Sequence, residues 1–332
     1  MSLKYIQVTA PSAHAEALRS TLADRDSIVD LRLSGIEDGE RTLHLVAGPQ
    51  DRQTLLDDIQ GHFGPGTDWR MIVLPVEASV PQPEEPEEVR ARLAWAATVQ
   101  TREELYTTIE KGASLDTNYL LLVALSTIVA AIGMSEDNIA VVIGAMVIAP
   151  LLGPNLALIL ATALGDRDLI RRALTTGTAG VALAIAFSFA LGLVMPLNLA
   201  AAELLARTDV SLSAVALALA SGAAAALSAT TGLSSTLVGV MVAVALLPPA
   251  ATIGLMLAAG DVGRASGAAL LLCANVICVN LSGQLVFLLR NVRPRTWLEK
   301  RAARQSVRLG LLVWAAGLLA LAAFFVLRDA AT

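Results

Sequence analysis

Charged side chains are scarce in this sequence and are missing from long stretches of it. Only 16% of the 332 residues are charged, 55% are hydrophobic, and the mean hydropathy is +0.64. A soluble globular domain rarely has this composition. The uncharged stretches are 119–135, 138–165, 173–202, 210–260, 265–289 and 309–327. Since a spanning helix needs about 20 apolar residues, the sequence predicts seven membrane spans, at 117–134, 139–164, 169–195, 211–228, 233–259, 264–289 and 308–327.

No Asp, Glu, Lys, Arg or His falls clearly inside any predicted span. Proton-driven transporters usually carry such a group within the membrane. Direct proton coupling is therefore disfavoured, unless Asp166 or Asp261, at the ends of two spans, serves as the ionisable group. Each of these follows a glycine at the start of a loop, which is typical of helix capping.

Catalytic and nucleotide-binding motifs are missing too, because the sequence has no GxSxG, HExxH, P-loop or dinucleotide-binding glycine pattern. His14, His44 and His62 precede the spans and do not have metal-ligand spacing. Cys273 and Cys278 are five residues apart in one span, on different helix faces, so neither a disulfide nor a metal pair is expected. The sequence therefore predicts no enzyme, no metal site, no cofactor and no nucleic-acid partner.

The region before the spans alternates strand and helix patterns. Period-2 runs at 4–10, 27–35, 41–48 and 68–76 predict strands, and amphipathic segments at 13–24 and 51–63 predict helices. This βαββαβ order is typical of an α+β ferredoxin-like domain. The predicted organisation is a cytosolic domain at 1–76, a linker and juxtamembrane amphipathic helix at 77–115, a transmembrane domain at 116–290, and a basic interfacial segment with the last span at 291–332. The juxtamembrane helix is expected along the cytosolic membrane face or on the soluble domain.

A repeat occurs within the apolar half. Residues 144–166, GAMVIAPLLGPNLALILATALGD, align without a gap with residues 239–261, GVMVAVALLPPAATIGLMLAAGD, and ten of the 23 positions are identical. The matches include a glycine at the start, a central proline and the terminal Gly-Asp. Repeated hydrophobic segments with prolines at matching places are typical of transporter cores.

The basic residues predict the orientation of the spans. The loop after the second span holds three arginines, and residues 290–308 hold seven basic residues, whereas the alternate loops have almost none. Because short-loop Lys and Arg are mostly cytoplasmic, we expect a multi-pass inner-membrane protein with a cytoplasmic N-terminus and an external C-terminus. Each repeat unit, 117–195 and 211–290, has three spans. Since three is odd, the two units must cross the membrane in opposite senses, as a 3+3 inverted repeat. The basic segment is expected to attract anionic lipid.

The prolines predict interruptions in the second and fifth spans. Proline lacks an N–H and leaves the carbonyl four residues earlier without its helical partner, which costs several kcal/mol in hydrocarbon. One hypothesis is a pair of broken helices that flank a substrate path; the alternative is two kinks that only shape the bundle. The candidate path residues are the prolines, the freed carbonyls and nearby polar groups: Met146, Pro150, Gly153, Pro154, Asn155, Val244, Ala245, Pro248, Pro249, Thr252, Asn275 and Asn280.

Three motifs resemble a known family. REELYTTIEKGASLDTNYLLL (102–122), IGAMVIAPLLGPNLAL (143–158) and GVMVAVALLPPAATIGL (239–255) are similar to the bacterial and archaeal membrane proteins of the DUF389 family, also called the uncharacterised hydrophobic-domain family. The resemblance covers roughly 100–290. It implies a multi-pass membrane architecture and, because the activity of the family is not established, it adds nothing on the substrate.

Two functions follow from these patterns. The first is a channel or secondary transporter for a small solute or ion, regulated by the cytosolic domain. The second is a membrane-anchored sensor or oligomeric scaffold that transports nothing. Small residues such as those at 222–226 allow close helix packing, so a homo-oligomer in membrane lipid is expected under either hypothesis.

Overall fold

The structure is a computed structural model that describes residues 3–23, 25, 27–37, 39–48, 52–64, 67–76, 102–231, 235–290, 292, 305–320 and 323. The side chains of residues 102 and 235–244 are not described. Residues 77–101 of the predicted linker and juxtamembrane helix, and residues 293–304 of the predicted basic segment, lie outside the described residues. The chain divides into two compact units, Met1–Arg102 and Glu103–Thr332.

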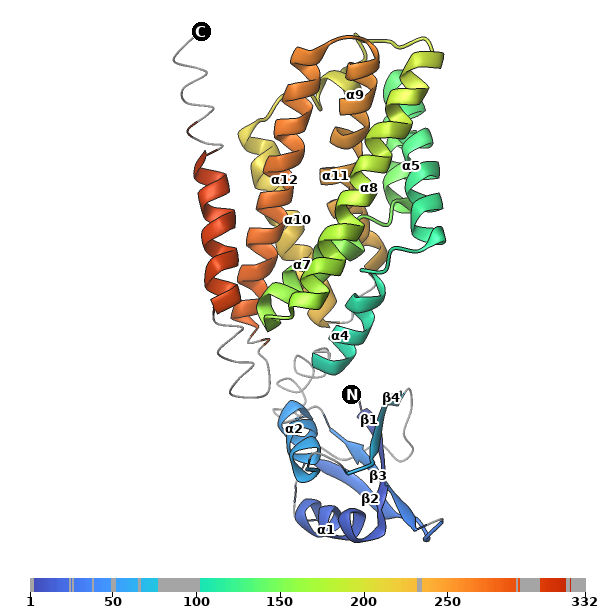
Figure 1. Ribbon diagram of the computed structural model, residues 1–332, viewed down its shortest axis with the longest axis vertical. Helices are drawn as coiled ribbons and strands as arrows, with labels where there is room; N and C mark the ends of the chain where they lie inside the picture. The colour runs from blue at the N-terminus through green and yellow to red at the C-terminus, as the bar shows by residue number, and fades with distance from the viewer. Residues whose placement is uncertain are drawn as a thin grey trace, which may run out of the picture. The chain divides into compact units, whose positions relative to one another are not determined.

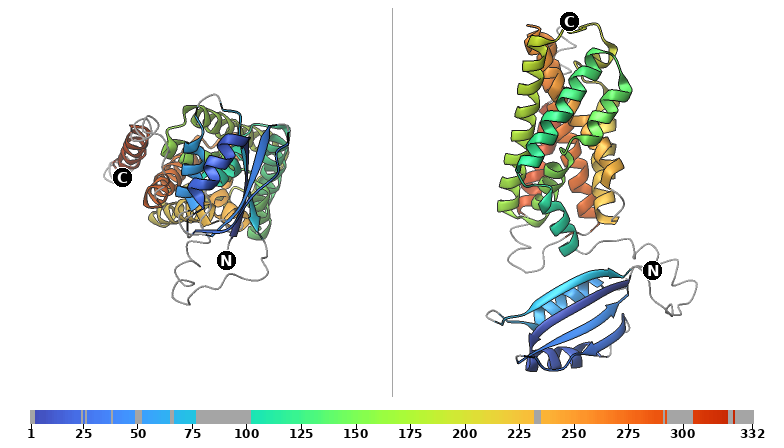
Figure 2. Two further views of the ribbon diagram at one scale, coloured as in Figure 1. Left: turned by 90° about the horizontal axis from the view of Figure 1, so that it is seen from below. Right: turned by 90° about the vertical axis from the view of Figure 1, so that its right-hand side faces the viewer.

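The first unit has the predicted βαββαβ order. Its elements are β1 (Leu3–Pro11), α1 (Ser12–Leu22), β2 (Ile28–Leu33), β3 (Glu40–Ala47), α2 (Arg52–His62) and β4 (Arg70–Val76). The strands form one sheet in the order β2-β3-β1-β4, with every neighbouring pair antiparallel (Figure 2). The predicted small antiparallel sheet is confirmed, and its strand order is that of the split βαβ pattern.

The core of this unit explains its layers. In β1, buried Ile6, Val8 and Ala10 alternate with partly exposed residues. The same buried cluster includes Leu18 of α1 and Leu55 of α2. Because alternate residues of a strand point to opposite faces, both helices cover one face of the sheet (Figure 1). The other face carries polar residues together with Ile72 and Leu74, which are 39% and 48% exposed.

The second unit is helical. Its helices are α4 (Arg102–Lys111), α5 (Thr117–Ser135), α6 (Ile139–Ile148), α7 (Leu152–Leu164), α8 (Arg167–Val194), α9 (Ala202–Leu205), α10 (Leu212–Thr231), α11 (Ser235–Ala258) and α12 (Val262–Leu289). Within the described residues, α5, α8, α10 and α12 are long and apolar enough to cross a membrane, and the bent pair α6–α7 makes a fifth. The apolar stretches Ala245–Ala258 and Gln305–Ala320 are shorter. By length and composition the structure thus has four or five candidate spans, and the total of seven spans stays a prediction.

Successive long helices run in alternating directions (Figures 1 and 2). The helices α5, α8 and α11 run one way, and the pair α6–α7, α10 and α12 run the other way. Across the two halves of the unit, α8 packs against α11, and α12 packs against α7. Glycines allow close approach at these contacts: a Cβ at Gly254 of α11 would collide with Ser188 and Ile185 of α8, and one at Gly283 of α12 would lie 2.6 Å from Ile159 of α7.

The Gly-Asp pairs of the sequence repeat form the same turn twice. Gly165 and Gly260 end α7 and α11 with φ angles of 74° and 76°, in the left-handed region that glycine tolerates. The next residues, Asp166 and Asp261, donate their N–H to Ala161 O and Met256 O, each at 2.9 Å. Both aspartate side chains then accept backbone N–H groups at the start of α8 and α12. The interpretation of these aspartates as helix caps is confirmed.

Candidate functional site

The first proline site interrupts a helix as predicted. The helix α6 ends at Ile148, α7 begins at Leu152, and their axes differ by 52°. Ala149 between them is extended, with φ −66° and ψ 122°. A residue before proline is pushed towards this conformation by the ring that follows it, so Pro150 accounts for the break.

The second proline site does not interrupt its helix, and the prediction of a break there is wrong. The helix α11 continues from Ser235 to Ala258 with Pro248 and Pro249 inside it. The reason lies on α12, where the side-chain amide of Asn275 donates to Ala245 O at 2.7 Å. Ala245 is the carbonyl that Pro249 leaves without a helical donor, so the amide replaces the missing hydrogen bond.

The helix that corresponds to α12 in the first repeat unit offers no such donor. Asn275 is the fourteenth residue of α12, and the fourteenth residue of α8 is Gly180. The space beside Gly180 is taken by the Tyr119 ring, and Leu151 Cδ2 is also near. The phenol of Tyr119 donates to Thr176 O at 3.1 Å instead. The helix α12 therefore supplies a side-chain donor at the second proline site, whereas Gly180 of α8 supplies none at the first.

Two of the predicted site residues meet beside the break. Asn155 lies in the first turn of α7 and donates its amide to Leu151 O at 2.9 Å. Asn280 of α12 donates its amide to Val276 O at 2.8 Å and to Asn155 Oδ1 at 3.3 Å. Asn155 is partly exposed, whereas Asn280 is only 1% exposed. The structure thus joins the two halves of the bundle through two amides that are far apart in the sequence.

The other predicted site residues are mostly packed. Met146, Pro154, Ala245, Pro248, Pro249 and Asn275 are buried, Pro150 and Gly153 are partly exposed, and the side chain of Val244 is not described. Thr252 is fully buried and its hydroxyl lies 3.6 Å from Met134 Sδ. The described side chains at Pro248 and Pro249 are therefore closed off from solvent in this conformation.

The helix α4 packs against the end of α7 and the start of α8, a contact that sequence reasoning missed. Tyr106 OH donates to Asp166 Oδ2 at 2.7 Å, and Glu110 forms an ion pair with Arg172 at 3.0 Å. Leu105 and Ile109 are buried in the same core as the long helices. Burial, followed by the hydrogen bond to the Asp166 carboxylate, raises the pKa of Tyr106 to about 12, so this phenol is a neutral donor at ordinary pH.

The segment after α4 touches the break itself. A Cβ at Gly153, in the first turn of α7, would lie 2.5 Å from the carbonyl oxygen of Gly112 and 2.9 Å from its Cα. The two backbones are therefore in direct contact. Nearby, Thr176 of α8 donates to Ala113 O at 2.7 Å. We call α4 and residues 112–116 the strap. The sequence predicted the helix of this strap but not its docking on α7.

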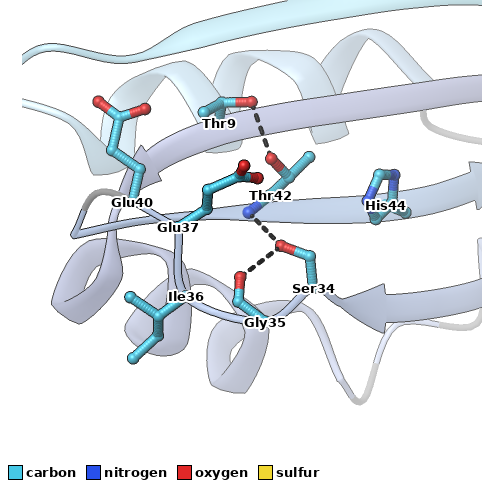
Figure 3. A pocket seen from close by; sticks show the side chains of 8 residues that line it. All are labelled: Thr9, Ser34, Gly35, Ile36, Glu37, Glu40, Thr42 and His44. Carbon is cyan, nitrogen blue, oxygen red and sulfur yellow. Dashed lines mark hydrogen bonds between the residues drawn. The ribbon is translucent and has the colours of Figure 1, made fainter.

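A separate groove lies on the first unit, at the turn between β2 and β3 (Figure 3). It holds about 600 Å³ and is lined by Thr9, Ser34, Gly35, Ile36, Glu37, Glu40, Thr42 and His44. Thr9 and Thr42 share a hydrogen bond of 3.1 Å, and His44 Nδ1 lies 2.5 Å from the hydroxyl of Tyr5. Two carboxylates beside hydroxyl groups suit a small polar ligand that carries positive charge.

Within the part of the chain that the structure describes, the long apolar helices, closely packed through glycines and with a proline break between α6 and α7, are those of a multi-pass membrane protein. The chain belongs to the DUF389 family. Residues 146–281 match the family described as "Domain of unknown function (DUF389)". The chain is also 33% identical over 275 residues to an uncharacterised protein of Methanocaldococcus jannaschii, which covers 82% of this chain and 83% of that protein. No solved structure matches.

Proposed function

We propose that the protein is a channel or secondary transporter for a small solute or ion, without enzymatic activity, in the inner membrane. The observation that carries this proposal is the break between α6 and α7 inside an otherwise regular bundle. Irregular backbone at membrane depth is tolerated where it is buried in protein or lines a water-filled cavity, and discontinuous helices form the substrate sites of many transporters. The partly exposed Asn155 at this break is the proposed polar contact for the substrate.

The proposed architecture is a 3+3 inverted repeat with a cytoplasmic N-terminus. Three observations support it. The helices from α5 to α8 and those from α10 to α12 run in opposite directions, and the turns at Gly165 and Gly260 are alike. The contact of α8 with α11 is matched by the contact of α12 with α7, as the repeat requires. In such repeats, alternating access moves one half against the other around a site near the midplane. We propose that α12 takes part in this movement, since Asn275 and Asn280 bind both proline helices.

The strap offers a route for regulation by the first unit. It follows the predicted linker in the chain, and it binds the break through Gly112 and the start of α8 through Tyr106 and Glu110. A ligand that shifted the strap would change the contacts of α7. A ligand shifts the equilibrium between two positions of the strap only by the difference in its affinity for the two. The size of the regulatory effect would therefore report that difference in affinity.

A second candidate function is a sensor or homo-oligomeric scaffold that transports nothing. The groove of Figure 3 favours it, because a ligand of the first unit would need a site of this size. The packed surroundings of Pro248 and Pro249 also favour it, since a scaffold needs no path there.

Flux into liposomes that contain the purified protein separates the two functions. A transporter moves at least one ion or small solute, and Pro154→Ala, which restores an N–H donor beside the break, lowers that flux. Pro196→Ala is the matched control, because Pro196 follows the end of α8, outside the helices. Vesicles that move no ion or solute, together with silent Pro154→Ala and Pro249→Ala variants in cells, would establish the scaffold instead.

A further inference from the structure

Three side-chain oxygens within the spanning helices are buried and have no hydrogen-bond partner among the described residues. They are Ser221 Oγ of α10, and Asn280 Oδ1 and Gln284 Oε1 of α12. Each of these residues is 1% exposed. A buried oxygen without a partner is costly, and three of them in one small region require an explanation.

The three oxygens belong to neighbouring turns of two helices, α10 and α12, that pack against each other. Asn280 and Gln284 are four residues apart and so share one face of α12, about 6 Å apart along its axis. Gly222, the neighbour of Ser221, packs directly on Val279 and Ser282 of α12. Ser221 therefore lies within about one helical turn of Asn280.

The orientation of the Asn280 amide is fixed by its other contacts. The nitrogen of Asn280 faces two acceptors, Val276 O and Asn155 Oδ1. Its oxygen is therefore the atom without a hydrogen-bond partner. The nitrogen of Gln284 lies 3.5 Å from Val307 O. By contrast Ser126, at the position in α5 that Ser221 occupies in α10, donates to Val123 O at 3.0 Å.

The interior around the break has more acceptors than donors. Each of the prolines 150, 154, 248 and 249 removes a backbone donor. The amide nitrogens of Asn155, Asn275 and Asn280 all donate to oxygens of the protein itself. What the two amide oxygens of Asn280 and Gln284 lack is a donor or a positive charge. An anion would need the free N–H groups at the start of α7, but there the carbonyl of Gly112 lies against Gly153.

We propose that the oxygens of Ser221, Asn280 and Gln284 form part of a site for a monovalent cation such as Na⁺ or K⁺. Neutral oxygens bind such ions in selectivity filters, whereas divalent and transition metals favour carboxylate, imidazole or thiolate ligands. This inference rests on the proposed transport function, of which it names the substrate class.

Liposome flux with Na⁺, K⁺ and Cl⁻ gradients tests the site in the full-length protein. Cation flux is expected to exceed anion flux. Asn280→Leu and Gln284→Leu, which keep the volume and remove the oxygen, are each expected to lower cation flux about tenfold or more. Thr127→Val is the matched control, because the buried Thr127 hydroxyl bonds only Val123 O of its own helix, and it should leave the flux unchanged.

A binding measurement covers the case in which a leucine variant does not fold. The detergent-solubilised wild-type protein is melted in NaCl, in KCl and in N-methylglucamine chloride at equal ionic strength. A ligand that binds only the folded state raises the melting temperature, so Na⁺ or K⁺ should raise it above the value in the bulky organic cation.

The outcomes separate this inference from the transport proposal. Flux of anions or neutral solutes without cations overturns the cation site and leaves transport standing. Absence of all flux overturns transport, and the melting experiment then decides the site by itself. Equal melting temperatures in all three salts show that water alone supplies the missing partners of the three oxygens, and this result overturns the inference.

Discussion

Replacing Gly153 by alanine tests the contact between the strap and the break. The added Cβ would meet the carbonyl oxygen of Gly112 at 2.5 Å and its Cα at 2.9 Å. Both are backbone atoms, so no side-chain rotation can relieve the collision. Overpacking of this kind costs about 1–3 kcal/mol, which corresponds to an increase of about 5-fold to 150-fold in the fraction of molecules with an undocked strap.

Trypsin cleavage after Lys111 measures this fraction. Lys111 ends α4 and is exposed, and the bond to be cut joins it to Gly112 in the packed contact. When opening is fast relative to cleavage, the cleavage rate follows the population of the open form. The Gly153→Ala protein should therefore be cut at this bond faster than the wild type by the same factor of about 5 to 150.

Gly144→Ala is the matched control. Gly144 lies in α6 of the same bent pair, but an added Cβ there meets nothing within 4 Å. Alanine in a helix interior is favoured over glycine by roughly 0.5–1 kcal/mol, so cleavage should not accelerate. If the two alanine variants are cut at the same rate as the wild type, the strap does not depend on the glycine contact and the reasoning is refuted.

Two other perturbations test the bonds around the prolines and the strap. Asn275→Leu should lower the stability of the detergent-solubilised protein by about 1–3 kcal/mol. In a Pro249→Ala background the loss should be clearly smaller, because the restored N–H reaches Ala245 O. Equal losses in both backgrounds would contradict the role of Asn275 as the donor that replaces the missing N–H. Tyr106→Phe should remove one phenolate absorbance step near pH 12. Since the pKa of Tyr106 is above its ordinary value of 10.0, the contribution of Tyr106 to docking of the strap is complete below about pH 10 and is lost as the pH rises towards 12. An unchanged high-pH titration in the phenylalanine variant would refute this raised pKa.

Local patterns in the sequence predicted much of this fold. Period-2 runs gave the four strands because strand burial depends on alternation. The Gly-Asp caps were predictable because capping needs only neighbouring residues. The break at Pro150 was predictable for a similar reason, since the proline acts on Ala149 and on its own helix.

The remaining features depend on contacts between distant segments. Whether Pro248 and Pro249 break α11 is decided by Asn275 of α12, and the sequence alone does not show which carbonyl an amide will reach. The packing of α4 on α7 and α8 depends on the approach of Gly112 to Gly153. Sequence reasoning placed α4 on the membrane face or on the soluble domain because its charges suit both locations.

The central claim is that two three-helix units cross the membrane in opposite senses, and cysteine labelling tests it most directly. In a protein with Cys273→Ala and Cys278→Ala, a single cysteine is placed at Arg167 or at Val262, the exposed first residues of α8 and α12. A membrane-impermeant maleimide should label Val262→Cys in intact spheroplasts, and Arg167→Cys only after permeabilisation. Labelling of both positions from the same side would contradict the inverted arrangement.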